Sequence, residues 1–277
     1  MTGRTILITG VSGGFGEALA TEALAQGWRV VGTVRTSQAL QTFEAKSPGN
    51  AIGRILDMME IDRIPGMIAE IEEQVGPIDV LVNNAGYGLE APLEELRLES
   101  IRHQFEVNVF APIVLMQAVL PYMRKRRGGR ILNISSIGGM MTFPGLGAYH
   151  ASKFALEAIS ESLGKEVRHF GIFVTAVEPG PFRTDWAGRS LVREPRTIAD
   201  YDSMFDPQRE IRRNRDGKQP GDPVKAAKAM LTILAEPNPP AHLLLGPEAV
   251  QRIDDRLKAL AEEIDAWRAL SVSTDFD

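Results

Sequence analysis

Two groups of residues in this 277-residue chain have types and spacing suited to chemistry: a tyrosine–lysine pair and a glycine-rich turn. Tyr149 and Lys153 stand four residues apart, and Ser136 lies thirteen positions before the tyrosine. A free phenol has a pKa near 10 and keeps its proton at neutral pH. A nearby ammonium group favours the phenolate, and a pKa lowered by about 2–3 units would suit general acid–base catalysis. The spacing therefore predicts a proton-transfer group at Tyr149.

A predicted helix over Ala148–Phe170 positions this pair. Four residues make about one helical turn, so Lys153 falls on the same face as Tyr149. His150 is also close in sequence, but one residue along a helix points about 100° away. We therefore interpret His150 as structural.

Ser136 and Asn108 are polar residues beside or within apolar elements. Ser136 follows a predicted strand, Arg130–Ser135, and at the carboxyl edge of a sheet its hydroxyl can bind a substrate oxygen. Ser135 competes with it for this role. Asn108 lies in the apolar helix predicted over Ser100–Met123, where a buried amide requires hydrogen-bond partners. Those partners belong either to a functional site or to ordinary bonds between helices.

The second group is the turn Thr9-Gly10-Val11-Ser12-Gly13-Gly14-Phe15-Gly16. It joins a predicted strand, Thr5–Thr9, to a predicted helix, Phe15–Gln26. Gly10, Gly14 and Gly16 would allow the tight bend, the close approach of a ligand and the packing of helix on strand. Backbone N–H groups and the helix N-terminus attract a pyrophosphate. The turn therefore predicts a dinucleotide site.

The end of the second predicted strand, Arg29–Val34, indicates which dinucleotide is bound. Enzymes that use NAD usually place an acidic residue there for the ribose 2′-OH, whereas an Arg accommodates the 2′-phosphate of NADP. This chain has Arg35 and no carboxylate over Val30–Thr36, and Ser12 offers a hydroxyl to the same phosphate. We predict NADP(H) in preference to NAD. The alternative is that Arg35 is an ordinary solvated cation.

Short β-branched runs alternate with amphipathic segments along the chain. The predicted strands are Thr5–Thr9, Arg29–Val34, Ile52–Asp57, Ile78–Asn83, Arg130–Ser135, Phe173–Glu178 and His242–Leu245. The predicted helices are Phe15–Gln26, Ile61–Val75, Ser100–Met123, Ala148–Phe170 and Pro223–Ala235. This alternation predicts an α/β fold, a Rossmann-type doubly wound parallel sheet of about seven strands with helices on both faces. No linker interrupts it, so we expect one catalytic domain over residues 1–277.

Residues 183–222 break this pattern, because they are rich in charge and turn residues. A loop of this length in a compact domain is usually a lid or binding loop, or is disordered. It follows the sixth predicted strand at the carboxyl edge, where ligands bind in such sheets. We predict a substrate lid over an apolar pocket. The expected pocket walls are Tyr87, Met140, Met141, Phe182, Trp186, Met204 and Phe205.

Taken together and in their order along the chain, the motifs resemble those of the single-domain branch of the short-chain dehydrogenase/reductase family. The resemblance rests on the glycine turn, Asn83-Asn84-Ala85-Gly86, Ser136 with Tyr149-x-x-x-Lys153, and Pro179-Gly180 followed by Thr184. It covers Thr5 to about Leu245, with a weaker likeness to the hydroxysteroid and retinol dehydrogenase subgroup. The family implies an oxidoreductase that transfers hydride between a nicotinamide cofactor and an alcohol or carbonyl group.

The resemblance also implies roles for single residues. Tyr149 would be the general acid or base, Lys153 would in addition hold the nicotinamide ribose, and Asn108 would carry a water linking Lys153 to solvent. The implied cofactor contacts are Asp57 and Met58 at the adenine, Asn84 and Gly86 at its ribose, and Pro179, Phe182 and Thr184 at the nicotinamide end. Phe15 replaces the aliphatic residue usual at its place, a change that leaves the backbone role intact.

The composition argues against several other classes of protein. A net charge of −5 gives no electrostatic reason to bind nucleic acid, and the basic run Arg124–Arg127 fits a helix C-terminus. With no Cys and four scattered His, we expect no metal site. The apolar stretch Val107–Met123 is short for a membrane span, which needs about 20 residues. We expect a soluble, cytoplasmic protein.

Other functions stay open at this stage. A sugar-nucleotide epimerase or dehydratase uses the same Tyr and Lys, but usually with a larger carboxyl-terminal domain and a different glycine spacing. A redox sensor that binds NADP without turnover tends to lose the Tyr or the Lys, and both are present here. The expected partner is a small alcohol, ketone or aldehyde. Family resemblance implies a homodimer or homotetramer that pairs through the helices carrying Asn108 and Tyr149.

Overall fold

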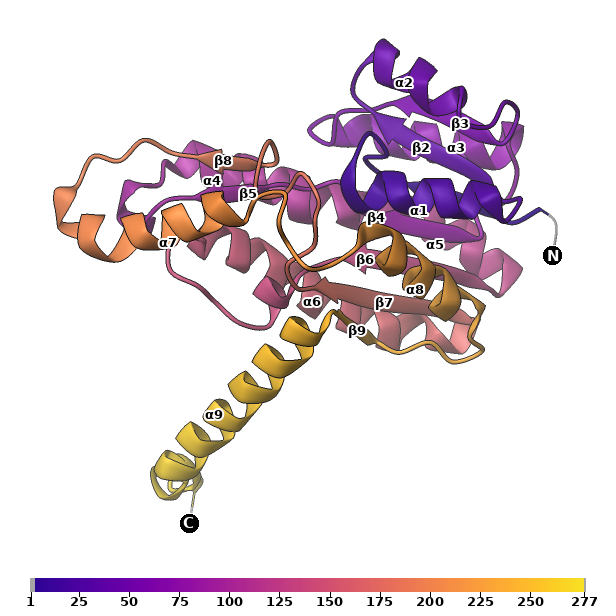
Figure 1. Cartoon of the computed structure of the whole chain (residues 1–277). Helices are drawn as coiled ribbons and strands as arrows, with labels where there is room; N and C mark the ends of the chain where they lie inside the picture. Colours follow the sequence, from indigo (N-terminus) through magenta and orange to yellow (C-terminus); the bar gives the residue numbers. More distant parts are fainter. Residues whose placement is uncertain (1–2, 277) are drawn as a thin grey trace.

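A parallel sheet of seven strands forms the centre of the fold (Figure 1). The computed structural model describes residues 3–276. The strands stand in the order β3-β2-β1-β4-β6-β7-β9. Their bounds are β1 (Thr5–Ile8), β2 (Arg29–Val34), β3 (Ala51–Ile55), β4 (Val80–Asn83), β6 (Gly129–Ile134), β7 (Ile172–Pro179) and β9 (His242–Leu245). The predicted Rossmann-type sheet is confirmed, and each strand lies within two residues of its predicted bounds.

The strand order reverses at β1, which pairs with β2 on one side and with β4 on the other. At such a reversal the connections leave the strand ends in opposite directions and open a crevice above them. The glycine turn follows β1 and Asn84 follows β4. The topology therefore brings these two predicted ligand-binding segments to the same edge of the sheet.

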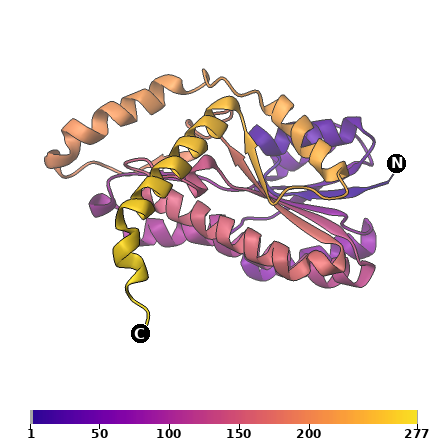
Figure 2. The same cartoon turned by 90° about the horizontal axis from the view of Figure 1, so that it is seen from below.

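Helices cover both faces of the sheet (Figure 2). Because side chains alternate along a strand, Ile6 and Ile8 of β1 join one core and Leu7 joins the other. The first core includes residues of α1 (Gly14–Ala25), α2 (Ser37–Glu44) and α8 (Pro223–Ala235). The second includes residues of α3 (Ile64–Gln74), α5 (Ala111–Arg126) and α6 (Gly147–Val167). Burial on both faces accounts for strands that are apolar throughout.

The helix predicted over Ser100–Met123 is part of a longer run. It comprises α4 (Leu98–Phe105), a π-helical turn over Glu106–Phe110, and α5. By length and composition alone, Leu98–Arg126 would be long and apolar enough to cross a membrane. In this fold, however, its α5 part lies against the sheet, where Leu115 and Val119 are buried.

The region predicted as an irregular lid contains regular structure. Its strand β8 (Leu191–Arg193) pairs with β5 (Gly88–Glu90), and it also contains the helix α7 (Asp202–Arg215). Single 3-10 turns lie at Ile61–Arg63, Leu93–Glu95, Ile137–Gly139, Arg168–Phe170 and Ala199–Tyr201. The sequence pattern missed α7 because only Phe205 among its residues is buried.

The last helix, α9 (Pro247–Val272), was also not predicted. Figure 1 shows it leading away from the body of the molecule. Only Ala249 and Ile253 of this helix are buried. Most of α9 therefore has no tertiary contact with the described body of the chain.

Candidate active site

The turn after β1 has a geometry that requires glycine at two positions. Gly10 has a φ of +73°, and its N–H donates to the carbonyl oxygen of Thr33 at 3.1 Å. A Cβ on Gly16 would lie 2.2 Å from the carbonyl oxygen of Gly10, which leaves no room for a side chain. The helix α1 begins at Gly14 without a side-chain cap. Its first N–H groups are therefore free to bind an anion, as a dinucleotide site requires.

Asn84 braces this turn from the end of β4. Its Nδ2 donates to the carbonyl oxygens of Thr9 at 2.8 Å and Gly10 at 3.0 Å. The hydroxyl oxygen of Thr9 accepts in return from the N–H groups of Asn84 and Ala85, both at 2.9 Å. These bonds tie the two strand ends together where the sheet order reverses.

A cavity of about 1210 Å³ lies over the carboxyl ends of the strands. Nearly all the predicted catalytic and cofactor residues line it: Gly10, Ser12, Gly14, Phe15, Arg35, Asp57, Met58, Asn84, Gly86, Ser136, Tyr149, Lys153, Pro179, Phe182 and Thr184. Gly16 and Asn108 lie outside the lining. Gly16 packs against the turn and Asn108 acts through hydrogen bonds to its neighbours. The structure thus brings segments from most of the chain to one cavity.

Four of the predicted pocket walls were wrong. The cavity is lined by Tyr87, Phe182 and Trp186. Met140 and Met141 instead pack at the base of α9. Phe205 is fully buried with the guanidinium of Arg196 lying 4.7 Å from its ring, and Met204 beside it is exposed. The predictions failed because residues 183–222 contain regular structure: in α7 the side chain of Phe205 is buried beside Arg196 and does not line the cavity.

Tyr149, Lys153 and Ser136 come together at the carboxyl end of β6. Tyr149 and Lys153 lie one turn apart near the start of α6, and both are buried. The Nζ atom of Lys153 is 5.9 Å from the centre of the Tyr149 ring and donates to the carbonyl oxygen of Ile134 at 2.7 Å. The hydroxyl oxygen of Ser136 accepts from the N–H of Gly138 at 3.0 Å.

Burial decides the protonation of this pair. It raises the pKa of Tyr149 to about 12, and interaction with Ser136 opposes it only in part. Burial also lowers the pKa of Lys153 to about 8, against the attraction of Glu157. The lowered pKa expected for Tyr149 is therefore not found, because burial disfavours the charged phenolate. Tyr149 is protonated at neutral pH, as a proton donor to a carbonyl oxygen must be.

Asn108 lies in the π-helical turn between α4 and α5. Its Nδ2 donates to the carbonyl oxygen of Tyr87 at 2.9 Å and to the hydroxyl of Ser152 at 3.0 Å. Its Oδ1 accepts from the N–H of Tyr87 at 3.1 Å. A π turn is often found at functional sites. Here the turn orients the Asn108 amide so that its hydrogen bonds join the segment after β4 to α6. Asn108 thus makes hydrogen bonds between elements, which is one of the two alternatives that the sequence left open.

His150 uses both ring nitrogens on backbone groups. Its Nδ1 lies 2.9 Å from the carbonyl oxygen of Gly138, and its Nε2 accepts from the N–H of Phe143 at 2.9 Å. Burial lowers the pKa of the imidazole, so a neutral ring with Nδ1 as donor satisfies both bonds. These contacts support the structural interpretation of His150, although an edge of the ring reaches the cavity.

The residues expected around the adenosine half line the same cavity as Tyr149. Arg35 is exposed just after β2, and Ser12 is exposed in the glycine turn. Asp57 and Met58 follow β3, the first exposed and the second buried. The cavity therefore carries a guanidinium group and a hydroxyl where a 2′-phosphate is expected.

Residues 183–222 are tied to Glu90, a residue that was not singled out from the sequence. Glu90 is fully buried in β5. Its carboxylate pairs with Arg193 of β8 at 3.0 Å, with Arg209 of α7 at 3.4 Å, and with Arg212. The abundance of Arg over residues 183–222 was visible in the sequence. Which acidic residue those arginines would meet, about a hundred residues earlier, was not.

Residues 183–222 also contact two parts of the cavity lining, Tyr149 and the glycine turn. The ring of Trp186 lies 5.1 Å from that of Tyr149. Arg189 forms an ion pair with Asp185 at 2.7 Å and donates to the carbonyl oxygen of Ser12, in the glycine turn, at 3.4 Å. Of these three residues only Trp186 was predicted from the sequence, because an irregular segment offers no spacing by which Asp185 and Arg189 could be placed.

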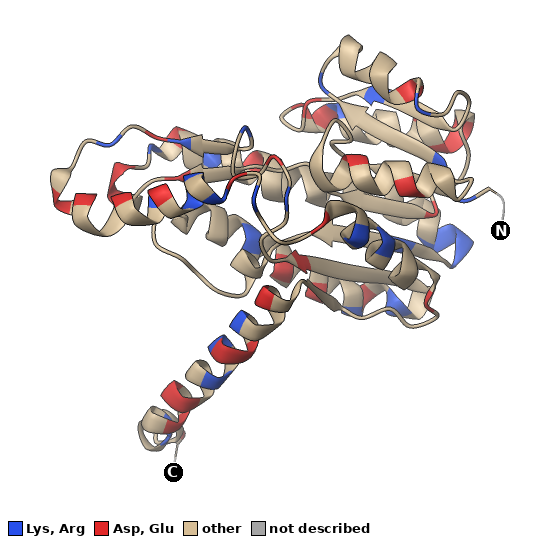
Figure 3. Ribbon diagram, viewed as in Figure 1, with Lys and Arg blue, Asp and Glu red and all other residues tan. Residues whose placement is uncertain are grey.

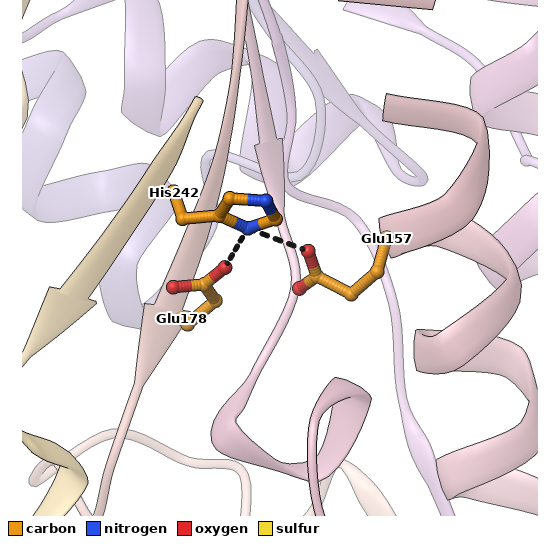
Figure 4. Close-up of side chains that lie close together, drawn as sticks. All are labelled: Glu157, Glu178 and His242. Carbon is orange, nitrogen blue, oxygen red and sulfur yellow. Dashed lines mark hydrogen bonds and ion pairs between the residues drawn. The ribbon is translucent and has the colours of Figure 1, made fainter. Parts of the chain in front are cut away.

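A cluster of three titratable side chains joins α6, β7 and β9 (Figure 4). The Nδ1 atom of His242 lies 2.7 Å from Oε1 of Glu178 and 3.5 Å from Oε2 of Glu157. Burial raises the pKa of both carboxyls, that of Glu178 to about 7. Burial alone would lower the pKa of His242, but the hydrogen bond to Glu178 and the two nearby carboxylates raise it. The donor atoms lie within 4.8 Å of one another, close enough to hold a metal ion, which the scattered His did not indicate.

Residues 4–194 match the family model for short chain dehydrogenases. A 3-ketodihydrosphingosine reductase of Bacteroides thetaiotaomicron is 37% identical over 254 residues, covering 89% of each chain. Human retinol dehydrogenase 8 is 35% identical over 251 residues, covering 86% of this chain and 79% of its own. A short-chain dehydrogenase of Streptomyces avermitilis has a structure that matches over 100% of both chains, with a TM-score of 0.92 and 38% identity.

The glycine turn, the Tyr149–Lys153 pair and the sheet that joins them thus agree with an independent match over most of the chain. The protein belongs to the short-chain dehydrogenase/reductase family, as the sequence motifs indicated. Its members are oxidoreductases that act on CH–OH or carbonyl groups and bind a nucleotide cofactor on a Rossmann-type fold.

Proposed function

We propose that this protein transfers hydride between NADP(H) and an alcohol or carbonyl substrate, with Tyr149 as the general acid or base. One observation carries the proposal: Tyr149, Lys153 and Ser136 line the same cavity as the glycine turn. A dinucleotide bound along that cavity could place its reactive end beside Tyr149, whose phenol is suited to move a proton at an alcohol oxygen. The bound nicotinamide supplies or accepts the hydride.

The chain's own residues supply the proton chemistry. In the reductive direction, the buried phenol of Tyr149 donates its proton to the developing alkoxide, a role that its raised pKa suits. Ser136 lies next to Tyr149 and offers a hydroxyl to the same substrate oxygen. Lys153 keeps a positive charge near the phenolate that forms, and it would also hold the nicotinamide ribose.

Three features support NADP(H) over NAD. Arg35 is exposed at the end of β2, where it can meet a 2′-phosphate, and Ser12 is exposed nearby in the glycine turn. The strand end carries no carboxylate that would repel that phosphate. Asp57 and Met58 would hold the adenine, Asn84 and Gly86 its ribose, and Pro179, Phe182 and Thr184 the nicotinamide end.

We infer an apolar substrate with a ketone, aldehyde or alcohol group. Tyr87, Trp186 and Val107 line the cavity, and the ring of Trp186 packs against that of Tyr149. Two relatives are named for 3-ketodihydrosphingosine reduction and for retinol dehydrogenation, and both names fit a reacting group on a larger apolar molecule.

We further propose a cytoplasmic protein with one catalytic domain, a substrate lid over residues 183–222, and a homodimer or homotetramer that pairs through α5 and α6.

The experiment that tests the proposed activity is an NADPH-consumption screen across ketones and aldehydes of graded size. Turnover that rises with apolar chain length would support both the reaction and the substrate class. NADPH binding without turnover on any carbonyl or alcohol would favour a redox sensor. Conversion of a sugar nucleotide without net NADPH consumption would favour an epimerase or dehydratase.

A further inference from the structure

The carboxyl-terminal helix α9 has an apolar stripe that the body of the molecule leaves uncovered. Leu257 is 55% exposed, Leu260 37%, Ile264 51% and Trp267 63%. At about 100° per residue these four side chains fall within an arc of about 80° on the helix. Exposed apolar side chains are ordinary when scattered, but a continuous stripe of large ones marks an interaction surface.

This stripe continues the face by which α9 is attached. At the base of the helix, Ala249 and Ile253 are buried in a cluster with Ile137, against Met140 and Phe143. Beyond Ile253 the same face carries the exposed stripe at alternating spacings of four and three residues. That spacing is the seam of a coiled coil, in which two helices pack side by side. The spacing of apolar residues in α9 is therefore suited to packing against a second helix.

We propose that α9 pairs in antiparallel fashion with α9 of a second copy of this chain. A register that sets Leu260 of one copy opposite Ile264 of the other also sets Leu257 opposite Trp267. Because the pairing is two-fold symmetric, each of these contacts forms twice. The four side chains of the stripe are then covered by the same four side chains of the second copy.

The charges of α9 also favour a second copy of this helix as the partner. In the proposed register, Asp254 of one copy lies near Arg268 of the other, so an attractive pair forms at each end. Ala261 would meet its own copy near the symmetry axis, where a small residue allows close approach. Glu263 would also meet its own copy, on the outer edge, and these like charges weaken the pairing.

A membrane surface suits this helix less well. Helices that lie on membranes carry mainly Lys and Arg on the polar face, which attract anionic lipids. Over Pro247–Val272, acidic side chains outnumber basic ones, and both signs are interspersed (Figure 3). A protein helix with matching charges is therefore the better partner.

The exposed part of α9 is short, so we expect the pairing to act together with other contacts between the two copies. From Leu257 to Val272 the helix rises about 24 Å, or roughly two heptads. The base of α9 also borders the active-site cavity through Glu248 and Arg252, which form an ion pair at 2.7 Å. Pairing would thus hold this border in place.

The wild-type chain contains no Cys, so single-cysteine variants test the pairing directly. We expect Ala261→Cys to form an interchain disulfide under mild oxidation, and the exposed Ala266→Cys, which lies on the opposite side of the helix, to remain mostly uncrosslinked. Equal cross-linking of both variants, or none, would overturn the proposal. Glu263→Gln should increase the cross-linked fraction of the Ala261→Cys variant, and a decrease would overturn the proposed register.

Sedimentation equilibrium on the full-length protein supplies a second measurement. Because the pairing acts together with other contacts, Ile264→Glu should raise the dissociation constant of the assembly by at least about tenfold, whereas Ala266→Glu, which adds the same charge on the opposite face, should leave it unchanged. Circular dichroism melts check that both variants are folded. If Ile264→Glu keeps the wild-type dissociation constant, or if the wild-type chain binds phosphatidylcholine vesicles and that variant does not, then α9 does not pair with a second copy.

Discussion

The ammonium group of Lys153 donates a hydrogen bond of 2.7 Å to the main-chain carbonyl oxygen of Ile134. This bond fixes the amine at the carboxyl end of β6, one helical turn from Tyr149. Lys153 is buried there, and burial lowers its pKa to about 8. At neutral pH the amine is therefore charged in an environment that disfavours its charge, as is usual for titratable groups at functional sites.

Lys153→Met should stabilise the fold at neutral pH by removing this buried charge. The folded-state pKa of about 8 lies below the ordinary value of 10.5, so the folded chain binds fewer protons than the unfolded chain between these values. Wild-type stability then rises with pH across that window. The higher melting temperature of the variant should shrink from pH 8 to 10.5 and disappear above it. Thermal melts with Lys165→Met, an exposed lysine on the same helix, provide the control, and a pH-independent gap would refute this account.

Gly16→Ala should disrupt the dinucleotide turn. The added Cβ would lie 2.2 Å from the carbonyl oxygen of Gly10, so the turn must shift, at a cost of about 1–3 kcal/mol. We expect NADPH affinity to fall by at least about tenfold. Gly66→Ala in α3 is the matched control, because a Cβ there meets nothing within 4 Å. Fluorescence titration with NADPH distinguishes them, and equal affinities in the two variants would contradict the role of the turn.

Arg35→Ala should weaken NADPH binding and leave NADH binding nearly unchanged. A charge-assisted hydrogen bond to a phosphate contributes about 1.5–3 kcal/mol, or roughly 10- to 100-fold in affinity. Arg63→Ala removes another exposed cation, one that pairs with Glu60 outside the cavity, and should change neither affinity. Parallel titrations with NADPH and NADH measure the effect. Tighter binding of NADH than NADPH by the wild-type protein would reverse the cofactor assignment.

Glu178→Gln should flatten the pH dependence of stability. Burial raises the pKa of Glu178 from 4.5 to about 7, and the pKa of His242 beside it is also raised. Both shifts mean that the folded chain holds more protons than the unfolded chain, so wild-type stability falls as pH rises from about 4.5 to 7. The variant should lose less stability over that range. Melts of wild type, Glu178→Gln and the exposed Glu73→Gln would show this, and parallel curves for all three would rule it out.

The sequence was most informative where function depends on local spacing. The glycine turn lies between a strand and a helix, and Tyr149 and Lys153 are separated by one helical turn, so their geometry follows from short-range rules. The alternation of strands and helices similarly defined the sheet and its carboxyl edge. These features need no knowledge of which distant segments meet.

The features that the sequence did not predict depend on long-range contacts. Glu157, Glu178 and His242 meet only because α6, β7 and β9 are neighbours in the fold. The helix α7 is held through Glu90 rather than by an apolar stripe of its own. The pKa of Tyr149 was predicted to be lowered but is raised, because burial, which depends on the whole fold, disfavours the phenolate.

The central claim is that Tyr149 transfers the proton in an NADPH-dependent reaction. The most direct measurement is NADPH oxidation by Tyr149→Phe on a carbonyl substrate that the wild-type protein reduces, alongside NADPH titration of both proteins. The variant keeps the ring and loses only the hydroxyl, so turnover should fall by about 10²- to 10⁴-fold or more while NADPH affinity stays within about twofold. Undiminished NADPH oxidation by a folded Tyr149→Phe variant would contradict the assignment.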